Sequence, residues 1–277
     1  MRIDAHQHFW SYDPVEYAWI GAGMESLRRD FLPDDLAPLL DQRQLDGSIA
    51  VQARQSLEET RWLLSLARES ERVRGVVGWV DLRSPDVAAE LDRLADEPAL
   101  VGLRHVVQDE PDDEFLLRDD FQRGVAALAG RGLIYDVLIY PRQLPAAVRF
   151  VERFPDQPFV LDHLAKPLIR DGAMEPWASL VAELARSPNV SCKVSGLVTE
   201  AHWRAWTPEE LVPYLDVALE AFGPERLLYG SDWPVCLLAS GYGRMFAATE
   251  DWAERRLSAQ ERVALFGGNA ARVYGLR

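Results

Sequence analysis

The sequence predicts an α/β fold, a single (β/α)8 barrel of the TIM type that spans residues 1–277 as one domain. Eight short β-type segments alternate with stretches in which apolar residues recur every three or four positions, a spacing typical of amphipathic helices. Single barrels of this kind commonly have this length. The segment from residue 10 to 46 is rich in Pro, Asp and aromatic residues, and we expect a long first βα loop there that covers the barrel mouth.

The predicted strands are apolar runs that end in polar or turn-forming residues. We expect them at residues 2–9, 47–53, 73–80, 100–108, 133–139, 158–165, 190–197 and 227–234. The stretches between them, such as LEETRWLLSLARES and PDVAAELDRLADE, have the periodicity of helices that cover a sheet. Pro85, Pro145 and Pro208 stand where helices are expected to begin, a position that suits a residue without a backbone N–H.

Composition excludes several classes of partner. The formal net charge of −14 argues against nucleic acid, because a phosphate backbone requires a basic surface. No apolar run is long enough to span a membrane, and no charged leader with an apolar core follows Met1. Cys192 and Cys236 lie in apolar surroundings, which favours buried free thiols in a reducing compartment. We therefore expect a cytoplasmic protein with no membrane partner, either a monomer or a small homo-oligomer.

Unusual polar residues occur late in the predicted strands. They are His6, His8, Gln52, Arg104, His105, Asp136, His163, Lys193 and Asp232. Four of the five histidines and one of the two lysines belong to this set. Because functional groups of a (β/α)8 barrel gather at the carboxyl ends of its strands, the distribution predicts an active site at the mouth.

Strand alternation suggests how the first strand contributes. A period of two places His6 and His8 on one side and Ile3 and Ala5 on the other. We expect the histidine side to face the barrel interior near its mouth. A satisfied core histidine is the simpler alternative for either residue alone.

The same alternation sends Asp162 and His163 to opposite sides, and we assign His163 to the site. Asp162 would then serve loop or helix amides. Arg104 and His105 present the same difficulty, which a β-bulge at the strand end would relieve.

Two further charges need an explanation on predicted buried strands. Asp136 is a plausible partner for Arg104, because a buried arginine requires a counter-charge. Lys193 is either a desolvated ammonium or part of a buried salt bridge. Asp232 follows an apolar strand in YGSDWP, where it forms an Asx-type turn or serves as a general base for water.

The motifs DAHQHFW, GLRH, LDHLAKP, KVSGL, YGSDWPV and GGNAARVYGL resemble those of the amidohydrolase superfamily and, within it, of amidohydrolase-related sugar lactonases of the L-fuconolactonase and L-rhamnonolactonase type. The resemblance covers nearly the whole chain. It implies a hydrolase that opens a sugar-derived (aldono) lactone to the sugar acid, with the small-molecule lactone as its partner.

The resemblance also assigns residues. The superfamily's metal-and-base positions are matched by His6, His8, His163 and Asp232, and lactonase-type motifs alone are matched by Arg104, His105 and Lys193. The fourth strand has no lysine to bridge two metals, and the fifth has no histidine, so a binuclear site is not expected. We expect no essential cofactor, because a lactone is an activated ester. The alternative is one zinc ion at His6, His8, His163 and Asp232.

In the expected mechanism Asp232 activates water, while Arg104, Lys193 and the imidazoles stabilise the oxyanion. His105 or His163 returns a proton to the leaving oxygen. Candidates for the sugar pocket are Trp10, Gln52, Trp79, Gln108 and Trp233. Two alternatives stay open. One is a mononuclear-metal hydrolase or decarboxylase for a small carboxylated substrate, and the other is a non-catalytic sugar-acid binding protein.

Overall fold

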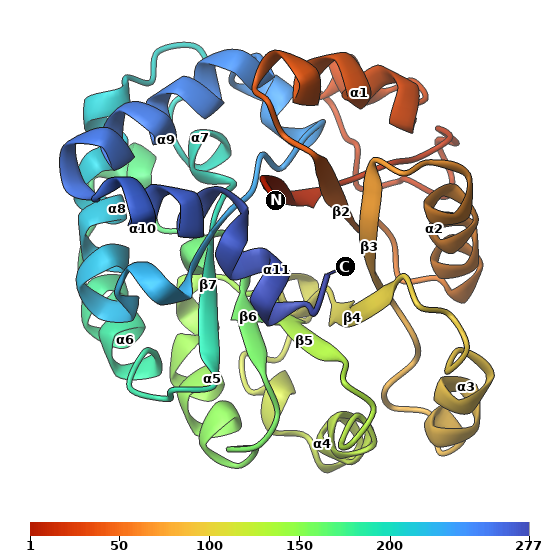
Figure 1. Cartoon of the computed structure of the whole chain (residues 1–277). Coiled ribbons are helices and arrows are strands. Elements are labelled where there is room, and N and C mark those ends of the chain that lie inside the picture. Colours follow the sequence, from red (N-terminus) through yellow and green to blue (C-terminus); the bar gives the residue numbers. More distant parts are fainter. Residues whose placement is uncertain (277) are drawn as a thin grey trace.

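Eight parallel strands follow one another around a barrel in the computed structural model, which describes residues 1–276 (Figure 1). The strands are β1 (Ile3–Gln7), β2 (Gly47–Val51), β3 (Val73–Gly78), β4 (Leu100–His105), β5 (Ile134–Val137), β6 (Phe159–Leu161), β7 (Val190–Val194) and β8 (Leu227–Tyr229). Each pairs with the next in sequence, and a parallel bridge between Gln7 and Trp233 brings the last strand back to the first. The predicted barrel and the order of its strands are confirmed.

Helices surround the barrel. They are α1 (Pro33–Gln42), α2 (Leu57–Glu69), α3 (Val87–Arg93), α4 (Asp119–Ala126), α5 (Leu144–Glu152), α6 (Trp177–Leu184), α7 (Leu197–Glu200), α8 (Pro208–Phe222), α9 (Tyr242–Arg256), α10 (Ala259–Val263) and α11 (Asn269–Val273). Pro208 is the first residue of α8 and Pro145 lies in the first turn of α5, as predicted, whereas Pro85 lies just before α3. No helix among the described residues combines the length and the apolar character needed to cross a membrane.

Two apolar layers hold the barrel together. Inside it lie Ile3, Ala5, Ile49, Val51, Val77, Val101, Ile134, Val160 and Leu228, together with Ala270 and Tyr274 from the C-terminal segment. The larger layer lies between the strands and the helices and includes the buried Cys192 and Cys236, both unpaired. Removing these side chains from water stabilises the barrel, and it leaves the strand ends free to carry polar residues.

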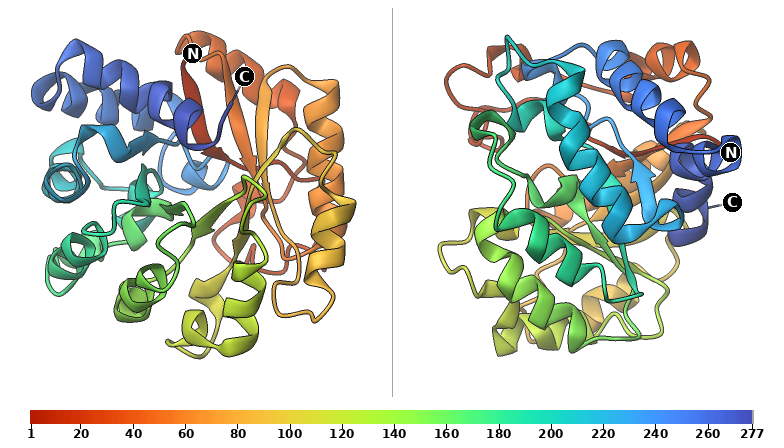
Figure 2. Two further views of the ribbon diagram at one scale, coloured as in Figure 1. Left: turned by 60° about the horizontal axis from the view of Figure 1, so that its bottom comes forward. Right: turned by 90° about the vertical axis from the view of Figure 1, so that its left-hand side faces the viewer.

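The loop between β1 and α1 lies at the end of the barrel opposite to both chain termini (Figure 2, right). It contains a short 3-10 turn, Glu25–Leu27, and α1 follows it. A buried carboxylate fastens it. Glu59 in the first turn of α2 accepts hydrogen bonds from the Tyr17 hydroxyl at 3.1 Å and from the backbone N–H groups of Ala53 and Arg54, each at 2.9 Å. The expected long first βα loop is therefore anchored to the βα loop next to it.

Several strands end earlier than predicted. β6 stops at Leu161 and β8 at Tyr229, so His163 and Asp232 lie in the loops that follow. Both residues have positive φ, 54° for His163 and 55° for Asp232, which is incompatible with an extended strand. Apolar patterning could not reveal these ends, because buried residues continue through both loops.

Candidate active site

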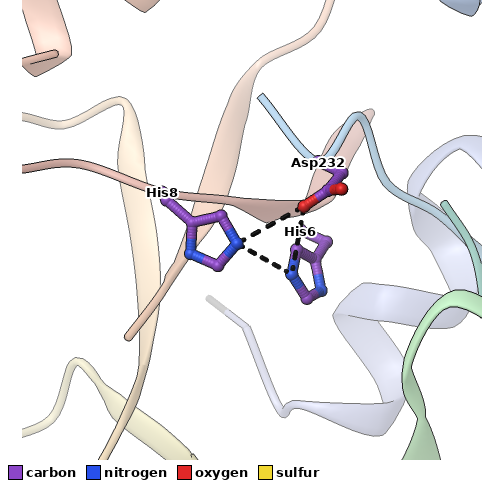
Figure 3. Close-up of side chains that lie close together, drawn as sticks. All are labelled: His6, His8 and Asp232. Atoms are coloured by element: carbon purple, nitrogen blue, oxygen red, sulfur yellow. Dashed lines mark hydrogen bonds and ion pairs between the residues drawn. The ribbon is translucent and has the colours of Figure 1, made fainter. Parts of the chain in front are cut away.

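The seam between β1 and β8 brings the first two histidines together with Asp232. The backbone N–H of His8 donates to the carbonyl of Trp233 at 2.7 Å. Figure 3 shows the side chains of His6, His8 and Asp232 converging from the two sides of this seam. Residues separated by more than 220 positions in the sequence thus share one site, as expected.

The predicted alternation of β1 holds for His6, which faces the interior, but is wrong for Ile3 and Ala5. Ile3 and Ala5 face the barrel interior, and His6 also reaches the interior, because the pairing register with β2 shifts between Asp4 and Gln7. A one-residue irregularity of this kind redirects every later side chain. Sequence periodicity cannot detect it.

Three polar atoms form the centre of the site. Nε2 of His6 lies 3.2 Å from Nε2 of His8. Oδ1 of Asp232 lies 3.4 Å from Nε2 of His8 and 3.8 Å from Nε2 of His6. All three residues are buried, with Asp232 5% exposed. Charges in such a site interact strongly, because little water screens them.

His163 joins these residues from an unusual turn. Its Nε2 lies 3.8 Å from Oδ1 of Asp232, and its Nδ1 lies 2.8 Å from the hydroxyl of Ser195. Four consecutive residues, 163–166, have φ between 53° and 57°. None of them is glycine, so each left-handed residue costs about 1–2 kcal/mol. The indole N–H of Trp177 donates to the carbonyl of Leu164 at 2.7 Å and holds this strained left-handed turn.

The turn also corrects the expectation for Asp162. Asp162 follows the inward parity of Val160 and points into the barrel, where it contacts His6 and Arg104. His163 reaches the same interior because the strained turn begins there. The assumption that only one of the two could face the site was wrong, since it required a regular strand.

The hydrogen bonds of the histidines determine which ring nitrogen is free. Nδ1 of His8 lies 2.7 Å from the carbonyl oxygen of Val51, which can only accept a proton. For His6, Nε2 faces the guanidinium of Arg104, which can only donate, and Nδ1 lies at an ion-pair distance of 3.3 Å from Oδ1 of Asp162. Both Nδ1 atoms therefore carry the proton, and the lone pairs on Nε2 point toward the centre of the site.

Burial keeps the imidazoles of His6 and His163 neutral. Burial lowers the pKa of His6 well below its ordinary value, although Asp162 opposes the shift. Burial likewise lowers the pKa of His163 to about 4. For Asp232, burial favours the protonated form, but the neighbouring imidazoles of His163, His8 and His6 outweigh it and lower the pKa below its ordinary value. At neutral pH the site therefore presents the neutral imidazoles of His6 and His163 beside an ionised carboxylate.

This arrangement fits a divalent metal ion. Ligands of a tetrahedral zinc with bonds of 2.0–2.1 Å lie about 3.3 Å apart, close to the separations of 3.2–3.8 Å measured between these atoms. Nitrogen lone pairs that face each other and a carboxylate repel unless a cation or a proton lies between them. Nδ1 of each imidazole also faces a polar protein group, as the second ring nitrogen of a metal-bound histidine does. The site thus gives no support to the expectation that no cofactor is essential.

A buried charge layer lies directly below, inside the barrel. Lys193 is fully buried, and its ammonium contacts Asp136 at 2.5 Å and Asp162 at 3.1 Å. Arg104 donates to Asp162 at 2.9 Å and to the side chain of Gln52 at 2.8 Å. The expected pair of Arg104 with Asp136 is wrong, because Lys193 takes Asp136. Lys193 forms the buried salt bridge of the two alternatives, and it is separated from the site by Asp162.

Arg104 also reaches upward. Its Nη1 lies 3.3 Å from Nε2 of His6, so one guanidinium N–H points at the centre of the site. The register of β4 against β3 shifts opposite Val76 and Val77, which lets Val101 and Arg104 both face inward. The irregularity therefore lies earlier in the strand than expected.

His105 points the other way. Its ring stacks on Phe115 at 4.8 Å, its Nε2 lies 2.7 Å from a carboxylate oxygen of Glu110, and the indole N–H of Trp79 approaches its Nδ1 at 3.5 Å. Both ring nitrogens already have partners outside the barrel. The structure does not bring His105 to the central group, and it contradicts a direct proton transfer by this residue.

The candidates for the sugar pocket divide. Trp10 is 0% exposed, and its indole N–H donates to the carbonyls of Leu27 and Arg29 within the first loop. Trp233 is also buried, against Phe9 and Phe31. Neither offers a free aromatic face, so both expectations are corrected: these two residues build the wall of the loop.

The other candidates stay closer to the expected role. Gln52 is buried at the end of β2, where its side-chain oxygen accepts from Arg104. Trp79 and Gln108 are half-buried in the loops after β3 and β4. These three remain candidates for substrate contacts.

Sequence reasoning missed the groups that orient the site. Asp162, Ser195 and Gly230 contact the imidazoles, and Gly230 is constrained because a Cβ there would lie 2.6 Å from Cβ of His6. All three adjoin residues that stood out, in LDHLAKP, KVSGL and YGSDWP. That adjacency was the available signal.

Comparison with known proteins decides the family. Residues 3–276 match the family model described as amidohydrolase. The chain belongs to the amidohydrolase family. This amidohydrolase is 50% identical to an L-fucono-1,5-lactonase of Burkholderia multivorans, with 100% of this chain and 96% of that protein covered. It is 40% identical to an L-fucono-1,5-lactonase of Burkholderia ambifaria, with coverage of 99% and 95%.

Two solved structures resemble this amidohydrolase over its full length. A crystal structure of an amidohydrolase from Burkholderia multivorans with bound HEPES is 48% identical with a TM-score of 0.97, and each chain is covered to 100%. A crystal structure of an amidohydrolase from the same species with bound zinc is 49% identical with a TM-score of 0.96, again with 100% of each chain covered.

Proposed function

We propose that this amidohydrolase hydrolyses an aldonolactone, with L-fucono-1,5-lactone as its substrate, to the open-chain sugar acid. The observation that carries the proposal is the convergence of three imidazole nitrogens and the Asp232 carboxylate at the barrel mouth. Two full-length relatives carry the name L-fucono-1,5-lactonase, which favours lactone hydrolysis over a decarboxylase or a non-catalytic binding protein.

We place one zinc ion at His6, His8, His163 and Asp232. The spacing of the His6, His8 and Asp232 atoms supports this assignment, and Nε2 of His163 lies 3.8 Å from Oδ1 of Asp232. The zinc in the crystal structure of a relative that is 49% identical also supports it. When bound, a zinc ion supplies Lewis acidity that polarises a carbonyl and eases the ionisation of water.

The residues of this chain would then divide the work. Asp232 takes a proton from the attacking water, since the neighbouring imidazoles outweigh the effect of burial and keep its carboxylate ionised. The Nη1 of Arg104, aimed at the centre of the site, donates toward the oxygen that gains negative charge as the carbonyl is attacked. The buried position of the cluster excludes bulk water, which strengthens both interactions.

A pH-indicator assay of L-fucono-1,5-lactone hydrolysis tests the proposal. We expect rapid acid release over the uncatalysed rate, loss of that rate after dialysis against a chelator, and its return with one equivalent of zinc. Full activity in the chelated, metal-depleted protein would reject the zinc assignment and leave Arg104 and the imidazoles as the polarising groups. Absence of acid release across a panel of aldonolactones, with zinc bound, would reject the lactonase.

A further inference from the structure

The C-terminal motif GGNAARVYGL has no part in the site described so far, yet it is built into the barrel. Gly267 presses against β1, and a Cβ there would lie 2.6 Å from the backbone nitrogen of Ile3. The side-chain amide of Asn269 donates to the carbonyls of Pro224 and Leu227, both at 2.8 Å, at the start of β8. The motif therefore contacts both β1 and β8, the two strands that meet at the site.

The end of this motif closes the barrel from the side opposite the mouth. Ala270 and Tyr274 belong to the apolar layer inside the barrel, and Leu276 packs against that layer. In Figure 1 α11 lies across the barrel end that also carries both termini. Tyr274 is 5% exposed, and the centre of its ring lies 5.4 Å from the ammonium of Lys193.

The hydroxyl of Tyr274 ends in that charge layer. It donates to the carboxylate of Asp136, with distances of 2.8 Å to Oδ1 and 3.0 Å to Oδ2. Asp136 holds the ammonium of Lys193, and Lys193 contacts Oδ1 of Asp162 at 3.1 Å. The same Oδ1 atom lies 3.3 Å from Nδ1 of His6. A series of hydrogen bonds and ion-pair contacts thus runs from the C-terminal segment to the imidazole of His6, a proposed metal ligand.

We propose that Tyr274 is a positioning residue for the metal site and acts through the ion pairs that hold the imidazole of His6. The hydroxyl fixes the Asp136 carboxylate, which determines how the single ammonium of Lys193 is shared between two aspartates. That sharing sets the position of the Asp162 oxygen facing Nδ1 of His6. Groups that orient metal ligands commonly change metal affinity about 10–100-fold when they are removed.

This inference rests on the metal site of the proposed function, and its test uses zinc binding instead of lactone turnover. Zinc affinity is measured by competition with a chromophoric chelator, and cobalt is used to record the absorption spectrum of the site. Tyr274→Phe removes only the hydroxyl and keeps the ring in the barrel. Tyr229→Phe is the matched control, since Tyr229 is also buried, but its hydroxyl faces Tyr242 and the sulfur of Met245 and not the buried charge layer.

We expect Tyr274→Phe to weaken zinc binding about tenfold and to shift the cobalt bands, while Tyr229→Phe keeps both within twofold of the wild type. Asp136→Asn should weaken zinc binding as well, and adding Tyr274→Phe to it should cause no further loss, because both changes break one series of contacts. Losses that simply add, or an unchanged affinity and spectrum in Tyr274→Phe, would overturn the proposal.

Two other outcomes are equally decisive. Should Tyr274→Phe be too unstable to purify, unchanged zinc binding by Asp136→Asn alone rejects the series of contacts. A wild-type protein that binds no zinc rejects the metal assignment itself, a result distinct from a variant that binds zinc as the wild type does.

Discussion

The backbone N–H of Asp232 donates to the carbonyl oxygen of His6 at 2.8 Å, so the main chain itself joins the proposed base to a proposed metal ligand. This bond belongs to the seam that closes the barrel. Barrel closure and the geometry of the site therefore depend on the same contacts, and a change at the seam must affect both.

Asp232→Asn should lower the rate of lactone hydrolysis at least about 100-fold, because the amide cannot accept the proton of the attacking water. Asparagine tolerates the positive φ of 55° at this position, so the fold should survive. The measurements are steady-state kinetics and a thermal melt. Near wild-type activity in a well-folded variant would reject Asp232 as the base.

Gly230→Ala should impair zinc binding and hydrolysis, because the new Cβ would lie 2.6 Å from Cβ of His6 and 3.2 Å from Cβ of Ser195. Gly241→Ala is the control, since a Cβ there has no neighbour within 4 Å. Zinc content after gel filtration should be low in the first variant and normal in the second. Equal zinc content would show that the seam accommodates the extra carbon without moving the imidazole.

Stability should depend on pH through Glu59. Burial raises the pKa of Glu59 from an ordinary value of 4.5 to about 7, despite the hydrogen bonds from Arg54 and Ala53 that oppose the shift. The folded protein then holds a proton that the unfolded chain releases near pH 4.5, so the free energy of unfolding falls as the pH rises through 7.

Glu59→Gln removes this titration and keeps an oxygen for the two backbone N–H groups. Relative to the wild type, the variant should gain about 2 kcal/mol in the free energy of unfolding between pH 5 and pH 8. Denaturant unfolding at both pH values measures the difference. Parallel pH profiles for the two proteins would contradict a raised pKa.

Gln44→Gly should raise the free energy of unfolding by about 1 kcal/mol, because Gln44 follows α1 with a positive φ of 55° that glycine adopts without strain. Gln42→Gly, two residues earlier at the exposed end of α1, should instead lower it by about 1 kcal/mol. Chemical denaturation of the pair checks both signs. Equal losses would mean that the positive φ carries no strain.

Much of this molecule follows from apolar periodicity. The eight strands, their order and the gathering of His6, His8, His163 and Asp232 at one end were predictable, because alternating strands and helices admit few topologies. The choice of partners inside the barrel was not. Arg104 stands opposite Asp136 in the register of β4 and β5, yet Asp136 pairs with Lys193. Asp162 contacts both Arg104 and Lys193.

Side-chain roles were also hard to predict when a residue type serves two purposes. Trp10 and Trp233 have the chemistry of a sugar platform, but the first loop uses them as its core. His105 stands beside Arg104 in the sequence, yet it faces the surrounding helices. Such assignments depend on the direction in which a side chain points after a β-bulge, and the local sequence pattern does not reveal that direction.

The left-handed turn at His163 is held in a strained backbone conformation. Four residues at φ between 53° and 57° carry a strain energy on the order of 4–8 kcal/mol. The hydrogen bond from the indole of Trp177 on α6 is one of the contacts that hold the turn. If α6 moved away, the turn would relax and the imidazole of His163 would leave the site, while the barrel stayed closed. On heating, this enzyme should therefore lose its activity at a lower temperature than the one at which it unfolds.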